Sequence, residues 1–140
     1  MKVIGLLLMV ALSGCRLPPP RGASPPRACA SLPYNVTFIL TAENLQPHDA
    51  ISIRGVRGDR PTIAPGGLYC VWGHYWLNSR ADATLCMSSG DGETRCFPTH
   101  CKDAFVFRFS MKGAAARQRI SLRGTDGRDF GWVEFSPAER

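Results

Sequence analysis

Apolar and polar residues alternate along the last three quarters of the chain. The clearest example is AFVFRFSM, residues 104–111, where every second side chain is large and apolar: Phe105, Phe107, Phe109 and Met111. Successive side chains of an extended strand point to opposite faces, so this segment predicts a strand with one buried face. The stretch YNVTFILTA, residues 34–42, follows the same rule and places Val36, Phe38 and Leu40 on one face.

Further extended segments are bounded by clusters of Gly, Pro, Asp or Asn, which are typical of turns. They are AISIRGV (50–56), GLYCVWGHYWL (67–77), ATLCMSS (83–89), RISLRG (119–124) and FGWVEF (130–135). No window of a dozen residues repeats apolar positions at helical spacing. The pattern therefore predicts an all-β fold, an antiparallel β-sandwich of about seven strands with immunoglobulin-like or transthyretin-like architecture, and a small β-barrel as the competitor.

The first fifteen residues, MKVIGLLLMVALSGC, have a different pattern, with one early lysine, an apolar run, and small residues before Cys15. The apolar run is too short to span a membrane as a helix, so residues 1–14 predict a cleaved export signal. The tetrapeptide Leu12-Ser13-Gly14-Cys15 resembles the lipobox of bacterial lipoproteins. The resemblance covers the leader alone, and it implies cleavage before Cys15 and acyl chains such as palmitate on that cysteine.

The expected location follows from this leader. Arg16 stands where an aspartate would resemble an inner-membrane retention signal, so we expect a lipid anchor in the outer membrane, with the domain on its periplasmic face. An ordinary secretory signal, with Cys15 incidental, is the alternative. Residues 16–33, RLPPPRGASPPRACASLP, contain six prolines and predict a semi-extended tether that reaches roughly 50 Å. The chain then divides into a signal (1–14), a lipid-anchored tether (15–33) and one β-sandwich domain (34–140).

The net charge of +6 invites a nucleic-acid interpretation, but its distribution argues against one. Four basic residues precede residue 31, and from there on 13 basic residues face 11 acidic ones, a net charge of +2. A nearly neutral domain without a stripe of lysine and arginine predicts no nucleic-acid partner. The early arginines are better placed to meet anionic lipid headgroups.

The six cysteines are Cys15, Cys29, Cys70, Cys86, Cys96 and Cys101. Lipidation of the first leaves five, an odd number that weighs against the lipobox. Export favours disulfides over metal binding, and the preferred pairs are Cys70 with Cys86 and Cys96 with Cys101. Other connectivities, including a bridge from Cys29 to a core cysteine, remain compatible with the sequence.

Chemistry-bearing motifs are sparse. His100 beside Cys101 suggests a zinc or copper site, but the spacing Cys-x3-His-Cys is not a paired-knuckle pattern. The same pair could be a Cys/His nucleophile and base, but neighbouring residues of a strand point to opposite faces, which disfavours that role. No carboxylate pair, phosphate loop or nucleophile elbow is found. We therefore expect no catalytic residues, no metal and no cofactor.

The segment VWGHYWLN, residues 71–78, concentrates aromatic residues. In a strand, Trp72, His74 and Trp76 share one face and Tyr75 lies on the other, so one set is core and one is available. The structural interpretation packs Trp72 on a disulfide at Cys70. The functional one is an aromatic surface that stacks on sugar rings or anchors a protein, with Tyr75 as its most exposed member.

A tripeptide that resembles the integrin signal, Arg57-Gly58-Asp59, lies in ISIRGVRGDRP. The stretch ISLRGTDGRD, residues 120–129, shares the frame Ile-Ser-apolar-Arg-Gly-x-x-Gly without the tripeptide. We therefore expect both to be hairpin turns, and keep Arg57 and Asp59 as binding candidates.

These observations predict a non-catalytic binding or accessory module of an envelope or secretion assembly, or an inhibitor of a wall-degrading enzyme. Its partners would be the membrane, through the anchor, and an envelope protein or glycan. The alternative is a secreted host-interaction glycoprotein with three bridges, glycan on Asn35, and the tripeptide or the aromatic surface as a receptor ligand.

Overall fold

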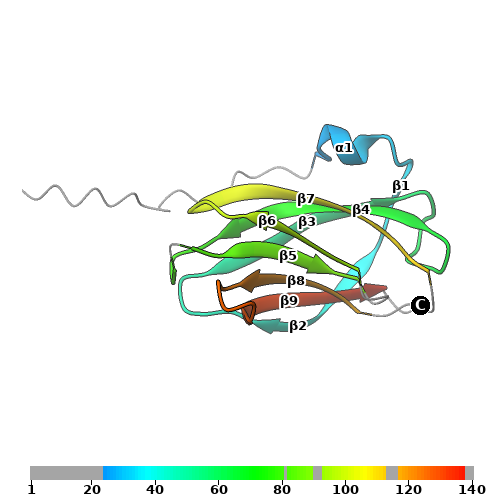
Figure 1. Ribbon diagram of the computed structural model, residues 1–140. Coiled ribbons are helices and arrows are strands. Elements are labelled where there is room, and N and C mark those ends of the chain that lie inside the picture. Colours follow the sequence, from blue (N-terminus) through cyan, green and yellow to red (C-terminus); the bar gives the residue numbers. More distant parts are fainter. Residues whose placement is uncertain (1–23, 81, 90–92, 113–116, 138–140) are drawn as a thin grey trace, which may run out of the picture.

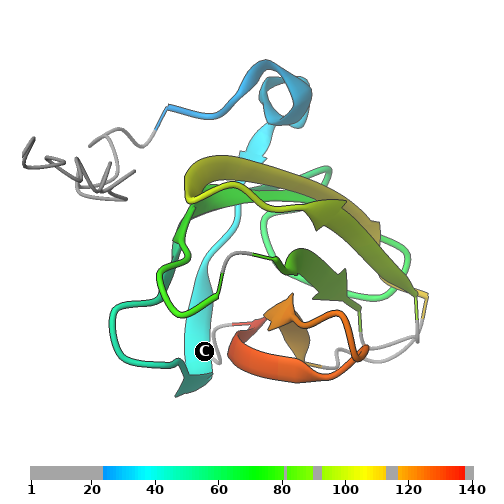
Figure 2. The ribbon, with the colours of Figure 1, turned by 60° about the vertical axis from the view of Figure 1, so that its left-hand side comes forward.

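A computed structural model describes residues 24–80, 82–89, 93–112 and 117–137. These residues form two antiparallel sheets that face each other (Figures 1 and 2). The four-stranded sheet has the order β1-β3-β4-β7, and the five-stranded sheet has the order β2-β9-β8-β5-β6. The elements are α1 (Arg27–Ala30), β1 (Tyr34–Asn35), β2 (Phe38–Asn44), β3 (Ala50–Gly58), β4 (Leu68–Trp76), β5 (Thr84–Ser88), β6 (Thr94–Pro98), β7 (Lys102–Ser110), β8 (Gln118–Arg123) and β9 (Asp129–Pro137).

The predicted all-β sandwich is confirmed, and the two separate sheets rule out a closed barrel. All seven predicted strands exist, but residues 34–42 split into β1 and β2, which pair in different sheets. The chain crosses between the sheets at Val36 and Thr37. β6 was not predicted, because its side chains are exposed and it lacks the apolar alternation of a half-buried strand.

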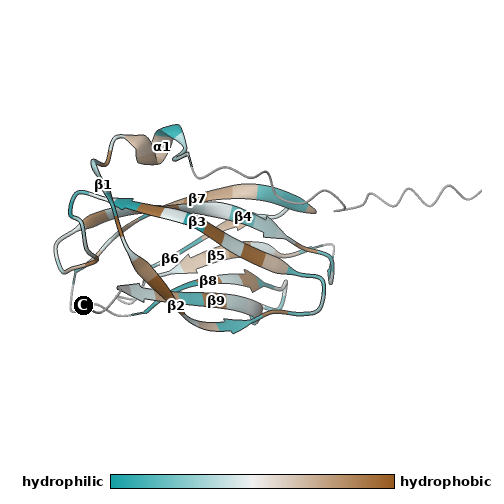
Figure 3. Ribbon diagram, turned by 180° about the vertical axis from the view of Figure 1, so that it is seen from behind, coloured by the Kyte–Doolittle hydropathy of each residue, from teal (hydrophilic) through white to brown (hydrophobic). Residues whose placement is uncertain are grey.

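The core lies between the sheets and confirms the clearest alternation. Phe105, Phe107, Phe109 and Met111 are all buried there. The prediction for Leu40 is wrong, since this residue is 56% exposed. It lies in β2, an edge strand whose register with β9 shifts between Leu40 and Ala42. Figure 3 shows hydrophobic residues in this strand, at the edge of its sheet.

Both preferred disulfide pairings are wrong. The bridges are Cys29–Cys70, with Cα atoms 5.4 Å apart, and Cys86–Cys96, with Cα atoms 4.1 Å apart. Cys70 and Cys86 cannot meet because Cys70 lies on the outer side of β4, in the cluster under α1, and points away from the sheet that contains β5. Cys96 lies directly opposite Cys86 in the β5–β6 ladder, so the unpredicted strand β6 supplies the true partner.

The predicted tether, residues 15–33, overlaps the folded domain at its C-terminal end. α1 packs on the outside of the four-stranded sheet, above β4 and β7 (Figure 1), and Cys29 fixes it covalently to β4. Residues from Arg27 onward therefore belong to the domain. The predicted signal peptide, Cys15 and most of the predicted tether lie outside the described residues. The described part of the chain has no helix of the length and hydropathy needed to span a bilayer.

Candidate binding face

The candidate site is the outer surface of the four-stranded sheet. Alternation along β4 points Tyr69, Val71 and Tyr75 into the core and leaves Trp72, His74 and Trp76 on the other side. We call this surface the aromatic face and define it by Trp72, His74, Trp76, Arg54 of β3 and Ala104 of β7.

Small neighbours make room for the large rings. Trp72 pairs across the sheet with Gly55 of β3, and His74 pairs with Ser52 on one side and Ala104 on the other. A Cβ atom on Gly55 would lie 2.5 Å from the Trp72 ring, so the indole lies directly against the glycine backbone. This close contact explains why a glycine is needed inside the strand.

One end of the face is covered. Trp72 is only 6% exposed and forms a second hydrophobic cluster with Cys29, Leu32 and Cys70. The interpretation of Trp72 as a residue packed on a disulfide is therefore correct. The bridge differs from the predicted one, and the cluster lies outside the sheet under α1 instead of between the sheets.

A set of buried nitrogen atoms on this face has no hydrogen-bond partner in the described structure. They are Arg54 Nε, Trp72 Nε1, His74 Nδ1 and Trp76 Nε1. Native proteins pair nearly all buried polar atoms, because an unsatisfied one costs about 1–3 kcal/mol. Two indoles and a guanidinium are donors only. These nitrogens are buried, so an external acceptor could reach them only if the side chains of the face moved.

His74 is held in its neutral form. Burial lowers its pKa from 6.5, the positive charge of Arg54 lowers it further, and Asp103 acts in the opposite direction. A neutral imidazole has one donor and one acceptor nitrogen. At pH 7 the face therefore carries the charge of Arg54 without a second charge from His74.

The expectation that Tyr75 is the exposed member of the aromatic group is wrong. Tyr75 is 4% exposed and lies in the core, where its hydroxyl accepts a hydrogen bond of 2.8 Å from the backbone N–H of His100. Burial raises the pKa of Tyr75 above 10.0. Alternation alone could not say which face of β4 was buried, because both carry large aromatic residues.

The side chains of Arg57 and Asp59, the two binding candidates of the tripeptide, form hydrogen bonds within the domain. Arg57 donates to the Leu32 carbonyl (2.8 Å) and to Asn35 Oδ1 (3.0 Å). Asp59 Oδ1 accepts from the backbone N–H of Leu68 (3.0 Å). These contacts use Arg57 Nε and Nη1 and one carboxylate oxygen of Asp59, and the binding role of the two residues stays a prediction.

The predicted turn at this tripeptide is also displaced. β3 continues to Gly58, which pairs with Tyr69, and the connection to β4 comes after it. Gly58 makes room for the Tyr69 ring, since a Cβ there would lie 2.6 Å from it, and is not in a left-handed conformation. The second copy does form the predicted hairpin, between β8 and β9, with Gly127 at φ 78°.

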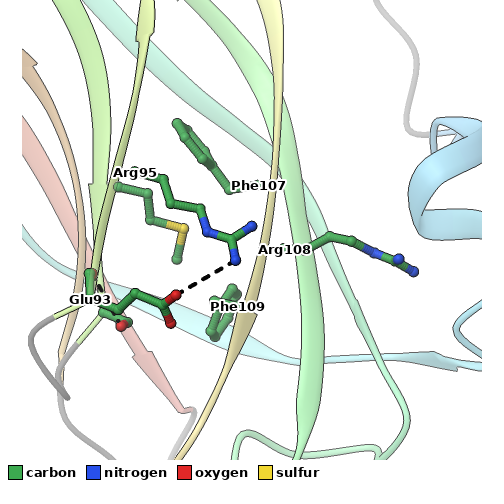
Figure 4. A pocket seen from close by; sticks show the side chains of 7 residues that line it. Glu93, Arg95, Phe107, Arg108 and Phe109 are labelled. Atoms are coloured by element: carbon green, nitrogen blue, oxygen red, sulfur yellow. Dashed lines mark hydrogen bonds and ion pairs between the residues drawn. The ribbon is translucent and has the colours of Figure 1, made fainter.

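Two other depressions are weaker candidates. The first, of about 10 Å³, lies where β6 and β7 face each other, and has room for about one water molecule. Figure 4 shows Arg95 ion-paired with Glu93 beside Phe107 and Phe109, while Arg108 points away toward α1; the ion pair is 3.6 Å long. The second, of about 320 Å³, is open, and its Arg123 is bound to Asp129 at 3.0 Å.

The described residues hold no cluster of three or more His, Cys, Asp or Glu side chains suited to a metal. The alternative site at Cys96, His100 and Cys101 loses its first thiol to the Cys86 bridge. Cys101 is disulfide-bonded as well. The absence of a metal, a cofactor and a catalytic role stays a prediction.

Sequence reasoning missed Arg54. The β3–β4 ladder shifts register between Ile53 and Gly55, and this β-bulge gives Arg54 its place beside His74. The signal was present: the core-facing residues Ile51 and Ile53 are two apart, but the next core residue is Val56, three positions later, so the alternation slips by one. Comparison of the chain with family models, curated proteins and solved structures finds no match to any of them.

Proposed function

We propose that this protein is a non-catalytic binding module, anchored by lipid on Cys15 to the periplasmic face of an outer membrane, and that the aromatic face holds its partner. The observation that carries the binding role is the grouping of two half-buried side chains, His74 and Trp76, beside Arg54 on the outer side of the four-stranded sheet. The anchor is supported by the lipobox-like tetrapeptide at Leu12–Cys15.

The chemistry of the face favours an envelope protein or a glycan. Indole rings stack on sugars and anchor protein interfaces. Two roles suit such a module, an accessory subunit of an envelope or secretion assembly and an inhibitor of a wall-degrading enzyme.

The experiment compares Trp76→Ala with Trp132→Ala in the full chain. Trp132 lies in β9 of the other sheet, under the guanidinium of Arg119 at 4.6 Å, and is the matched control. A photo-cross-linking residue at the exposed position Ala104 should capture envelope proteins, or the protein should sediment with peptidoglycan. Trp76→Ala should abolish the interaction and Trp132→Ala should preserve it. If both folded variants lost the interaction equally, or if neither lost it, the aromatic face would be excluded as the binding site.

A second candidate, the secreted glycoprotein, is favoured by one observation. Cys101 is disulfide-bonded, and none of the described cysteines is a free thiol. An acylated Cys15 leaves five cysteines, whereas three bridges use all six. The intact mass of the mature protein from its own host decides between them. Acyl mass on a chain that begins at Cys15 supports the lipoprotein; three bridges without lipid support the secreted form.

A further inference from the structure

We propose that the Cys86–Cys96 disulfide is a thiol-exchange site, where a dithiol protein attacks the sulfur of Cys96 and thereby releases strand β6 from the sandwich. The site is separate from the aromatic face and from the predicted lipid anchor. Three features of the bridge support this role: the exposure of one of its residues, its place in the β5–β6 ladder, and the contact that the other sulfur makes.

The two disulfides whose ends the structure describes differ in exposure. Cys29 and Cys70 are both fully buried, in the cluster under α1. Cys86 is fully buried as well, but Cys96 is an exposed residue of β6. A thiolate must reach a sulfur atom to break a disulfide, and exposed bridges are the labile ones. Attack on the folded domain is therefore expected at Cys96, whereas the Cys29–Cys70 bridge must first become accessible through a local opening.

The bridge is the central fastening of β6. This strand is at the edge of the five-stranded sheet, where it pairs with β5, and all five of its residues are exposed (Figure 1). Cys86 and Cys96 form the third of the five residue pairs in the ladder. One of the two outermost pairs includes Pro98, which has no backbone N–H to donate. The ladder that remains after loss of the bridge is therefore short and incomplete.

Side-chain contacts add little to this ladder. The ring of Phe97 is 47% exposed and stacks on Phe107, with the ring centroids 5.1 Å apart. Arg95 is ion-paired with Glu93, but both side chains are exposed, and such a pair contributes little to stability. The pair also joins β6 only to the residue just before it (Figure 4). An edge strand held in this way opens readily once its covalent link is broken.

The reaction consists of two successive thiolate displacements. A thiolate of the dithiol protein attacks Cys96 Sγ, the Cys86–Cys96 bond breaks, and Cys86 leaves as a thiolate. The Thr84 hydroxyl lies 3.5 Å from Cys86 Sγ and can donate to this sulfur as its charge develops, which offsets part of the cost of a thiolate at a buried residue. The second thiolate of the dithiol protein then attacks its own sulfur in the mixed disulfide, and Cys96 leaves. The bridge gains two electrons and two protons, and the dithiol protein is oxidised to a disulfide.

Release of β6 changes what the domain exposes. Residues 84–88 of β5 lose a strand neighbour, so their backbone groups on that side become open to pairing with another strand. Phe107 loses the ring of Phe97. Reduction thus opens a sheet edge, and oxidation closes it again.

The test is a time course of reduction of the protein isolated from its own host, under native conditions, with reduced thioredoxin as the dithiol protein. Samples are quenched with acid and alkylated, and peptide mass spectrometry follows each cysteine separately. Cys86 and Cys96 should lose their bridge at least ten times faster than Cys29 and Cys70, which are the buried control. A local opening that costs as little as about 1.4 kcal/mol slows attack tenfold.

Two variants test the mechanism. Thioredoxin with its second active-site cysteine replaced by serine traps the mixed disulfide, which should form on Cys96 and not on Cys86. Thr84→Val keeps the branched shape and removes the hydroxyl, so it should slow reduction of this bridge about fivefold, the effect of one hydrogen bond, and leave the Cys29–Cys70 rate unchanged.

Hydrogen exchange tests the release of the strand. When Cys86 and Cys96 are both replaced by alanine, the amides of residues 84–88 that face β6 should exchange at least tenfold faster, as they should in the reduced protein. Amides of β4, in the other sheet, should keep their protection and so show that the variant is folded.

The proposal fails if both bridges are reduced at the same rate, if thioredoxin is trapped on Cys86, or if the β5 amides of the reduced protein exchange no faster than those of the oxidised one. None of these outcomes affects capture by the aromatic face, so the experiment with Trp76→Ala succeeds or fails independently.

Discussion

Replacing Tyr75 by phenylalanine separates a core role for this residue from a binding role. The change keeps the buried ring and removes the hydroxyl that accepts the His100 N–H at 2.8 Å. We expect a loss of about 1 kcal/mol in the free energy of unfolding, since exposed His100 lets water replace part of the bond. For a domain of this size that lowers Tm by about 4 °C. Tyr75→Ala removes the ring as well and should cost about 3–5 kcal/mol.

The pH dependence gives an independent check on the same residue. Because burial raises the pKa of Tyr75 above 10.0, the unfolded chain loses the phenol proton at a lower pH than the native protein does. Unfolding then releases a proton, so the free energy of unfolding falls as the pH rises from about 10. Tyr75→Phe should show less of this fall than the unmodified protein.

Urea unfolding at pH 7.5 and at pH 10.5, followed by tryptophan fluorescence, measures both effects. Capture of the proposed partner by Tyr75→Phe should equal that of the unmodified protein, because Tyr75 points away from the aromatic face. Full stability combined with lost capture would show that Tyr75 is an exposed ligand contact, and would refute its placement in the core.

The remaining predictions concern other parts of the domain. Burial, and to a smaller extent the charge of Arg54, lowers the pKa of His74, so the native protein binds a proton less readily than the unfolded chain does. The free energy of unfolding should therefore fall as the pH drops below 6.5. Urea titrations of His74→Gln should show a smaller fall. Replacing Cys29 and Cys70 by alanine removes a bridge between cysteines that are 41 residues apart, and should lower the free energy of unfolding by about 4 kcal/mol in the chain-entropy account. A loss below about 1 kcal/mol would show that the bridge constrains only α1. Gly127→Ala should cost about 1 kcal/mol in thermal unfolding, because a Cβ there meets no atom within 4 Å and only the φ of 78° opposes it; an unchanged Tm would contradict this.

The fold was predictable from the sequence where the alternation of apolar and polar residues alone decided which face of a strand is buried. Strict alternation in residues 104–111 identified β7 and its buried face correctly. The same rule failed at residues 34–42, because the chain leaves one sheet after Asn35 and joins the other at Phe38. A local pattern records that a segment is extended, but it does not record which strand lies beside it.

The site was predictable in part for a related reason. The sequence placed Trp72, His74 and Trp76 together, as the structure does. Whether that side or the Tyr75 side faced the core depended on the second sheet, which is far away along the chain. The disulfide pairs were missed because strand adjacency decides them, and β6 carries no apolar alternation to reveal it.

The bridge between α1 and β4 also has a mechanical meaning. β4 is an inner strand, hydrogen-bonded to β3 on one side and β7 on the other. Traction applied from the N-terminal side of Cys29 reaches this strand through a sulfur–sulfur bond, before it can load the two-residue strand β1 or the edge strand β2. A pulling force is therefore shared by the best-supported strand of the sheet, and the weak edge strands are shielded from being peeled away.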